Sequence, residues 1–188
     1  MAPQAGVGLA WGAWGLSWLA AGWWSGPTVS TPAAGRELWA RLPLLIGFLL
    51  LFGFYPWADA IEAPLWHIGT AAGWALVALA GLGFLFAWWA RLYLGHLWSS
   101  RITRKAGHRV VDSGPYRLVR HPIYTGIIVA GFATATVRGT AGAFVGAAVL
   151  TLGWYLKARL EEEFLREELP DYRSYARRVP MLVPFLRI

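Results

Sequence analysis

Two short segments of this chain concentrate the polar side chains that are able to bind a charged small molecule. The first, residues 114–124, begins with a Gly-Pro-Tyr turn signal and continues through Arg120, His121, Pro122 and Tyr124. Pro122 suits the first position of a helix, so we expect His121 at the helix cap and Tyr124 about one turn further on the same face. The unpaired N–H groups at a helix start attract a carboxylate or a phosphate. This segment therefore predicts an anion-binding helix start.

A simpler interpretation of the same segment also stays open. Arg117, Arg120 and His121 are residue types that anchor a helix at the membrane interface, and Gly-Pro-Tyr is also an ordinary turn. A turn, two arginines, a cap histidine, a helix-start proline and a tyrosine nevertheless occur within eleven residues. This density favours a binding site.

The second polar segment is an acidic run that follows the last apolar stretch of the chain. On a helix, Arg159 shares one face with Glu162 and Glu163, while Leu160 and Phe164 lie on an apolar side. The run predicts an amphipathic helix that leaves the membrane. Such a run is also typical of a solvated face with weak ion pairs, and this alternative stays open.

The composition indicates that membrane helices position these segments. Of 188 residues, 57% are hydrophobic and 14% are charged, where about 25% charged is usual. We expect an all-α, polytopic integral membrane protein with five transmembrane helices and a cytoplasmic C-terminal amphipathic helix and tail. A single domain, 1–188, would hold three spans in 1–93 and the polar segments in 94–188. Five apolar stretches approach the roughly 20 residues that a crossing needs, at 5–24, 42–58, 65–90, 122–137 and 139–156.

The distribution of basic residues predicts the orientation. With five spans and an outside N-terminus, sixteen of the seventeen Lys and Arg residues fall on one side, and Arg138 falls on the other. The positive-inside rule places the richer side in the cytoplasm, together with the C-terminus and both polar segments. We then attribute the net charge of +7 to the membrane topology and to contacts with membrane lipids as partners. No nucleic acid is expected as a partner.

Several residue counts exclude classes of chemistry. The chain has no cysteine, which excludes thiol nucleophiles, disulfides, iron–sulfur clusters and cysteine zinc sites. We expect no metal, and the histidines are His67, His96, His108 and His121.

No basic residue precedes Arg36, so the first stretch does not resemble a signal peptide and should stay in the mature protein. Most tryptophans, Trp11 among them, fall near predicted span ends and are expected at the interface.

The two polar segments together resemble the isoprenylcysteine carboxyl methyltransferase family and, more broadly, the phospholipid methyltransferase superfamily. The resemblance covers residues 94–184 and includes Gly-Pro-Tyr-Arg from Gly114, Arg-His-Pro-Ile-Tyr from Arg120, and Gly126. After a helical hairpin come the acidic run from Arg159 and a Tyr-x-x-Tyr, Val-Pro tail. Two positions depart from the family pattern. The linker before Tyr172 is one residue short, and Met181 stands where a basic residue is common.

The resemblance implies an all-helical membrane enzyme that encloses S-adenosylmethionine between these segments. Matching positions imply cofactor-binding residues Gly114, Tyr116, Arg120, His121, Tyr124 and Glu162, and catalytic residues Arg159 and Glu163, without a metal. The implied acceptor is a lipophilic or lipidated molecule, with an isoprenylcysteine-type carboxylate preferred.

Alternatives to this acceptor and to this function stay open. A phospholipid, a small thiol or an amine is another possible acceptor. An NADPH-dependent membrane reductase of similar fold and a non-enzymatic membrane carrier or structural subunit are other possible functions. The richness in Arg, Ala, Gly and Trp suggests a prokaryote with GC-rich DNA, and hence its inner membrane. The oligomeric state is not readable from the sequence.

Overall fold

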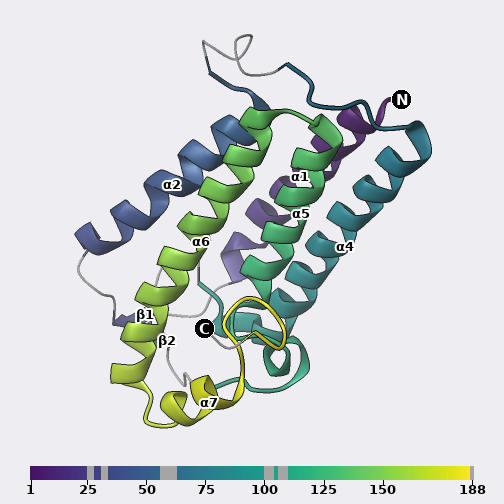
Figure 1. Cartoon of the computed structure of the whole chain (residues 1–188). Helices are drawn as coiled ribbons and strands as arrows, with labels where there is room; N and C mark the ends of the chain where they lie inside the picture. Colours follow the sequence, from purple (N-terminus) through teal and green to yellow (C-terminus); the bar gives the residue numbers. More distant parts are fainter. Residues whose placement is uncertain (25–27, 31–33, 56–62, 100–103, 106–109, 187–188) are drawn as a thin grey trace.

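The fold is a bundle of long helices with the short elements gathered at one end. The computed structural model describes residues 1–24, 28–30, 34–55, 63–99, 104–105 and 110–186. The helices run side by side along the bundle axis (Figure 1). The long helices are α1 (Pro3–Ala20), α2 (Ala34–Phe52), α4 (Thr70–Leu94), α5 (Pro122–Arg138) and α6 (Ala141–Glu168).

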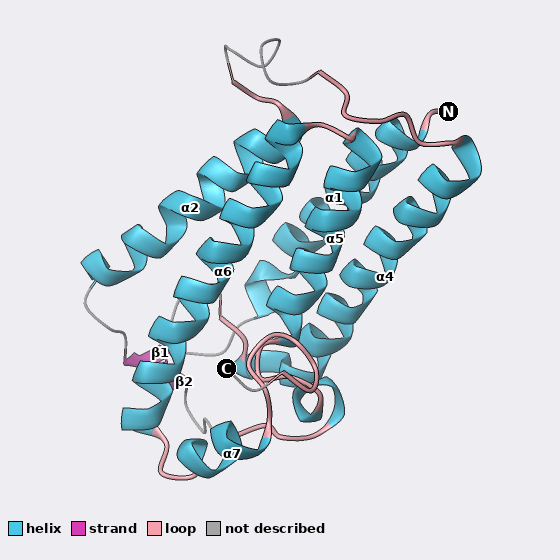
Figure 2. Ribbon diagram, in the orientation of Figure 1, coloured by secondary structure: helices cyan, strands magenta, loops and turns pink. Residues whose placement is uncertain are grey.

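The short elements lie at the lower end of the bundle in Figure 2. Strands β1 and β2 pair there in antiparallel fashion, with Thr28 opposite Lys105. At the other end, Pro64 forms a bridge with Thr140. The connections therefore alternate between the two ends, as the five predicted spans require. The short elements are η1 (Ala21–Trp24), β1 (Thr28–Ser30), η2 (Gly95–Leu97), β2 (Arg104–Lys105), η3 (Gly114–Arg117) and α7 (Tyr172–Arg178).

The all-helical expectation is confirmed in the main, because every predicted span overlaps one of the long helices. Two segments among the described residues, Thr70–Leu97 and Ala141–Glu168, are long and apolar enough to cross a membrane. Trp39–Phe52 is a shorter apolar helix, and residues 56–58 of the second predicted span lie outside the described part. Five membrane crossings, and the side of the membrane that each end faces, therefore stay predictions.

Local capping explains the hairpin between α5 and α6. Gly139 ends α5 in the left-handed conformation, with φ of 66°, and its N–H donates to the Ala135 carbonyl. Thr140 then caps α6, because its side chain accepts the Ala143 N–H. No proline interrupts the chain before Pro170, so the predicted amphipathic helix is the second half of α6 rather than a separate element.

Glycines allow close helix contact at two places that set the position of the site. A Cβ on Gly126 of α5 would collide with the Gly83 carbonyl of α4, and one on Gly146 would collide with the α2 backbone at Leu51. Small residues let helix backbones approach closely. These contacts fix α5 against α4 and α6 against α2.

Trp11 corrects the expectation of an interfacial tryptophan, because it is 8% exposed and lies in the core. Its indole N–H donates to the Thr134 hydroxyl at 2.9 Å, and its ring meets Phe84 edge to face. In the bundle, one face of α1 packs against α4 and α5, and Trp11 lies on that face. The position of a residue along the chain does not show which face of its helix will be packed. The tryptophan thus ties α1 to α5.

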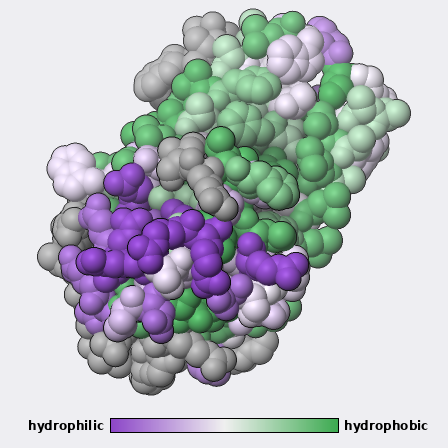
Figure 3. Space-filling model, turned by 60° about the horizontal axis from the view of Figure 1, so that its bottom comes forward, coloured by the Kyte–Doolittle hydropathy of each residue, from purple (hydrophilic) through white to green (hydrophobic). Residues whose placement is uncertain are grey.

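Polar and apolar surfaces are separated along the bundle. Polar side chains gather on the end that carries the short elements, and hydrophobic side chains cover the flank behind it (Figure 3). Exposed hydrophobic residues of the long helices include Leu16, Leu45, Leu82 and Leu85. An exposed apolar belt of this kind is what a bilayer covers.

Candidate active site

A cavity of about 240 Å³ lies at the polar end of the bundle. It is bounded by the C-terminal part of α4, the start of α5, the second half of α6 and helix α7. Its polar wall contains Arg120, His121, Tyr124, Lys157 and Glu161. The apolar wall contains Trp14, Trp18, Leu94, Trp98, Ile127 and Trp154. The cavity therefore joins a charged rim to an aromatic interior.

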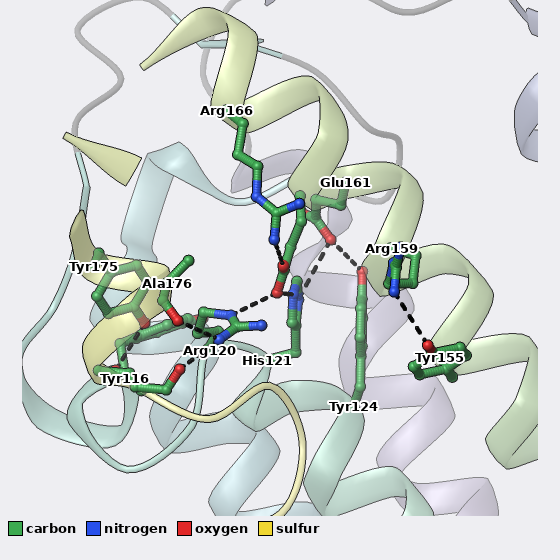
Figure 4. A network of polar contacts seen from close by, with 12 residues as sticks. Tyr116, Arg120, His121, Tyr124, Tyr155, Arg159, Glu161, Arg166, Tyr175 and Ala176 are labelled. Atoms are coloured by element: carbon green, nitrogen blue, oxygen red, sulfur yellow. Dashed lines mark hydrogen bonds and ion pairs between the residues drawn. The ribbon is translucent and has the colours of Figure 1, made fainter. Parts of the chain in front are cut away.

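Glu162 forms the buried anchor behind the polar wall. Its Oε1 accepts from Arg120 Nε at 2.6 Å and lies 3.2 Å from His121 Nε2. Its Oε2 accepts from Arg166 at 2.8 Å, one turn along α6 (Figure 4). The side chain is fully buried and is not among the residues that line the cavity. Glu162 thus holds Arg120 and His121 in place, because three partners occupy its two oxygens.

Arg120 also fixes the C-terminal tail. Its guanidinium donates to the carbonyl of Ala176 at 2.8 Å and to that of Val179. The backbone N–H groups of Arg120 and His121 donate to the carbonyls of Pro180 and Met181, at 2.8 and 3.1 Å. The Val-Pro tail therefore lies across the entry to α5.

Three aromatic rings form a stack across the cavity wall. Tyr124 stacks on His121 at 5.3 Å between ring centroids and on Trp154 at 4.5 Å. The Tyr124 hydroxyl donates to Glu161 Oε2 at 2.8 Å. The Lys157 ammonium lies 5.5 Å from the Tyr124 ring and 5.4 Å from the Trp154 ring. An aromatic stack, a carboxylate and an ammonium thus lie on one wall.

The structure brings Tyr116, Arg120, His121 and Tyr124 together at the cavity, as their predicted roles require. Tyr116 is held in place because its carbonyl accepts the Tyr175 hydroxyl at 2.7 Å. Burial raises the pKa of both phenols, so they stay neutral.

Gly114 supports the site from outside the cavity. Its φ is 57°, and a Cβ would lie 2.6 Å from the Tyr93 ring. The glycine therefore enables the turn that places Tyr116. His108 lies outside the described residues, and the residues that are described contain no group of three metal-ligating side chains.

Arg159 and Glu163, the two predicted catalytic residues, are not brought to this cavity. They line a second, more open hollow beside α2, together with Trp39 and Tyr155, whose hydroxyl accepts from Arg159 at 3.3 Å. Each residue turns a helix by about 100°, so Glu163 lies on the far side of α6 from Glu161. The structure thus separates the two predicted catalytic residues from the predicted cofactor residues.

Glu161 and Lys157 are polar residues of the wall that sequence reasoning did not select. A signal for them existed, because Lys157, Glu161 and Leu165 follow one another at four-residue spacing and all three line the cavity. Trp14 and Trp18 were also missed as site residues. They come from the first helix, and no local pattern links that helix to the polar segments.

Comparisons with known proteins connect this geometry to a reaction. The model of the isoprenylcysteine carboxyl methyltransferase (ICMT) family matches residues 76–167, from α4 to the second half of α6. Methanethiol S-methyltransferase 2 of Bradyrhizobium diazoefficiens is 33% identical over 179 residues, which cover 85% of this chain and 68% of that protein.

Two further relatives have names that indicate other functions. The cobalt-zinc-cadmium resistance protein CzcN of Cupriavidus metallidurans is 32% identical over 80% of this chain and 64% of its own length. Protein-S-isoprenylcysteine O-methyltransferase B of Arabidopsis thaliana is 30% identical over 46% of this chain and 45% of its own length. The chain thus spans about two thirds or less of these relatives.

Proposed function

Because the chain belongs to the isoprenylcysteine carboxyl methyltransferase family, we propose that it transfers a methyl group from S-adenosylmethionine to a small apolar thiol. The observation that carries the proposal is the cavity in which the Glu161 carboxylate and the Tyr124–Trp154 stack meet an aromatic interior. A charged cofactor and an apolar acceptor need surfaces of opposite character that lie side by side. This cavity provides both.

The residues of the cavity fit S-adenosylmethionine, which brings an electrophilic methyl group on a sulfonium when bound. The Trp154 ring, which lines the cavity at the end of the stack, suits a sulfonium through cation–π attraction. Glu161 suits the amine or the ribose hydroxyls, and Lys157 suits the carboxylate. In this proposal His121 orients Tyr124 by stacking, and Glu162 keeps His121 and Arg120 in position.

The proposed reaction is a direct displacement. The thiol loses its proton, its sulfur bonds to the methyl carbon, and the bond from that carbon to the sulfonium sulfur breaks. The products are a methyl thioether, S-adenosylhomocysteine and one proton. The released proton passes to water. Alignment and the exclusion of water supply most of the rate.

The choice of a thiol departs from the isoprenylcysteine carboxylate preferred on sequence grounds. Relatives named as methanethiol S-methyltransferases match most of this chain, whereas the isoprenylcysteine enzyme matches 46% of it. The family match also favours methyl transfer over the reductase and carrier alternatives.

A transfer assay with labelled S-adenosylmethionine tests the proposal. The purified protein in detergent is offered methanethiol, a farnesylcysteine analogue and an ethanolamine lipid in parallel. We expect label in the methyl thioether. Label in the carboxyl ester or the lipid, with none in the thioether, would overturn the choice of acceptor.

We further propose that the long helices span a bacterial inner membrane with the cavity at the cytoplasmic end. The apolar flank, the basic residues at the cavity end and the bacterial relatives support this placement. Because the chain has no cysteine, single replacements report topology cleanly. A membrane-impermeant maleimide applied to intact cells should label Ala141→Cys, in the hairpin, and not Ser174→Cys, in α7. The reverse pattern would invert the orientation.

A further inference from the structure

Tryptophan rings form a continuous wall at the apolar end of the cavity. Trp14 and Trp18 belong to α1, Trp98 directly follows η2, and all three line the cavity. The ring centroids of Trp14 and Trp18 are 5.1 Å apart, and those of Trp18 and Trp98 are 5.6 Å apart. Rings at such distances are in contact, so a hydrocarbon chain cannot pass between neighbouring rings. We call Trp14, Trp18 and Trp98 the tryptophan wall.

A second layer of side chains supports the tryptophan wall from behind. Phe84 of α4 stacks on Trp14 at 5.2 Å, and Trp88 meets Trp18 edge to face at 5.4 Å. The Trp88 indole N–H also donates to the Ser17 hydroxyl at 3.1 Å. Neither Phe84 nor Trp88 lines the cavity. A ring of the wall therefore cannot move outward without displacing this packed layer.

Arg91 connects the two parts of the tryptophan wall. Its guanidinium carbon lies 3.3 Å from the ring centroid of Trp98 and 5.5 Å from that of Trp18. Its Nη2 donates to the carbonyl of Ala21, the residue that follows α1. A planar guanidinium stacks on a ring and donates at its edge at the same time, which an ammonium does not. Arg91 is 2% exposed and does not line the cavity, so it holds Trp98 against the end of α1 without touching a bound molecule.

The cavity is small for the two molecules that the proposed function requires. Its volume of about 240 Å³ is below the roughly 300–1,000 Å³ of typical ligand pockets, and cofactor and acceptor have to share it. The polar wall suits the cofactor, which leaves the acceptor chain the space in front of the tryptophan wall. A chain that reaches the wall extends further only if a ring moves.

We infer that the tryptophan wall sets the maximum length of the acceptor, so that the cavity takes thiols with a short alkyl chain, and that Arg91 is a positioning residue that keeps the wall closed. The inference rests on the proposed function and adds the residues that select the acceptor by length. A methylene group that fits is buried in apolar surroundings and strengthens binding. The first one that does not fit has to displace a packed ring.

A series of straight-chain thiols tests the inference. Methyl transfer from labelled S-adenosylmethionine to ethanethiol, 1-butanethiol and 1-octanethiol is measured as kcat/KM with the purified protein in detergent. The readout is the ratio of the value for 1-octanethiol to that for ethanethiol. Detergent takes up the same share of each thiol in every sample, so differences in this ratio between variants report the protein alone. We expect 1-octanethiol to be the poorest acceptor of the wild type.

Trp18→Ala removes the ring at the middle of the wall. The space that it leaves should admit about two further methylene groups, so the ratio should rise about tenfold. Trp98→Ala removes the ring that Arg91 holds and should change the ratio in the same direction. Trp89→Ala is the matched control, because Trp89 is 46% exposed and does not line the cavity. Its ratio should equal that of the wild type.

Arg91→Lys tests the positioning role. The ammonium keeps the charge but does not stack on Trp98 as a plane, so the wall should loosen and the ratio should rise about threefold. The ratio does not depend on the fraction of protein that is folded, so a merely structural role of Arg91 would leave it unchanged. Affinity for S-adenosylhomocysteine, measured by calorimetric titration, should stay at the wild-type value in every variant.

The outcomes separate this inference from the proposed function. An unchanged ratio in both Trp18→Ala and Trp98→Ala, or 1-octanethiol as the best acceptor of the wild type, overturns the inference while methyl transfer to thiols stands. An unchanged ratio in Arg91→Lys alone overturns the role of Arg91.

The proposed function fails if no thiol is methylated by any of these proteins. Binding of the same thiols to the protein saturated with S-adenosylhomocysteine then decides the inference. A shift of the binding preference toward 1-octanethiol in Trp18→Ala supports the tryptophan wall as the length limit. The same preference as in the wild type, or no binding of any thiol, overturns it.

Discussion

Arg120 and Glu162 lie 42 positions apart in the chain, and their side chains meet at 2.6 Å in the interior of the protein. The contact joins the residue two before α5 to the second half of α6, and the same guanidinium holds the C-terminal tail through two carbonyls. One ion pair therefore brings together three of the segments that surround the cavity. It supports the site from behind, because Glu162 does not line the cavity.

Glu162→Gln is expected to destabilise the protein strongly. The neutral side chain leaves the Arg120 and Arg166 guanidinium groups without their counter-charge. Removing one partner of a buried ion pair typically costs about 3–5 kcal/mol in the free energy of unfolding. Thermal unfolding in detergent measures the loss, with the exposed Glu167→Gln as control. Equal unfolding temperatures in the two variants would contradict this role.

Glu161→Gln and Glu163→Gln should differ in cofactor affinity. Glu161 lies on the cavity wall, and Glu163 lies in the hollow beside α2. Loss of a charge-assisted contact should weaken binding of S-adenosylmethionine about tenfold in the first variant and leave the second unchanged. Calorimetric titration of the cofactor measures both. A loss confined to Glu163→Gln would place the cofactor in the hollow beside α2 and contradict its assignment to the cavity.

His121→Ala should also weaken cofactor binding, because the imidazole supports Tyr124 by stacking and contacts Glu162. We expect a reduction of about tenfold, measured by the same titration. The unfolding temperature is recorded in parallel. It shows whether a lower affinity comes from a destabilised fold, through the lost Glu162 contact, or from the missing imidazole in the site. Unchanged affinity would remove His121 from the site.

Gly126→Ala should disturb the start of α5. The added methyl group collides with the Gly83 carbonyl, and backbone has to move to accommodate it. Overpacking of this kind typically costs about 1–3 kcal/mol, and methyl transfer should fall with it. Gly12→Ala is the control, because a Cβ there meets nothing within 4 Å. A stable, active Gly126→Ala protein would show that the close approach of α4 and α5 is dispensable.

The stability of the protein should fall at alkaline pH. Burial raises the pKa of Tyr175 above its ordinary value of 10.0. The unfolded chain therefore releases this proton at lower pH than the folded protein does, and the free energy of unfolding decreases as the pH rises above about 10. Burial also raises the pKa of Tyr116 and Tyr172, which act in the same direction.

Tyr175 contributes to stability through a hydrogen bond and through the raised pKa of its phenol, and Tyr175→Phe separates these two contributions. The variant loses the 2.7 Å hydrogen bond to the Tyr116 carbonyl and should be less stable at pH 8. Its unfolding temperature should then fall less steeply than that of the wild type between pH 9 and pH 11. Parallel curves for the two proteins would argue against this role of Tyr175.

The local pattern of the chain was sufficient to predict part of the site. A helix start at Pro122 places His121 and Tyr124 on one face whatever the rest of the fold does, because that relation depends only on helix geometry. The same holds for the hairpin around Gly139, where a C-cap glycine and an N-cap threonine follow one another. These features need no long-range contact.

The sequence by itself determined the helical class, the apolar stretches and the residues at the entry to α5, because periodicity and capping are local properties. Tertiary structure alone decided which face of α6 meets the cavity, and so replaced Glu163 with Glu161 on the wall. It also brought Trp14 of α1 to Trp154 of α6 around one cavity. The rotation of a helix about its axis follows from packing against its neighbours, and the spacing of residues along one helix does not contain that information.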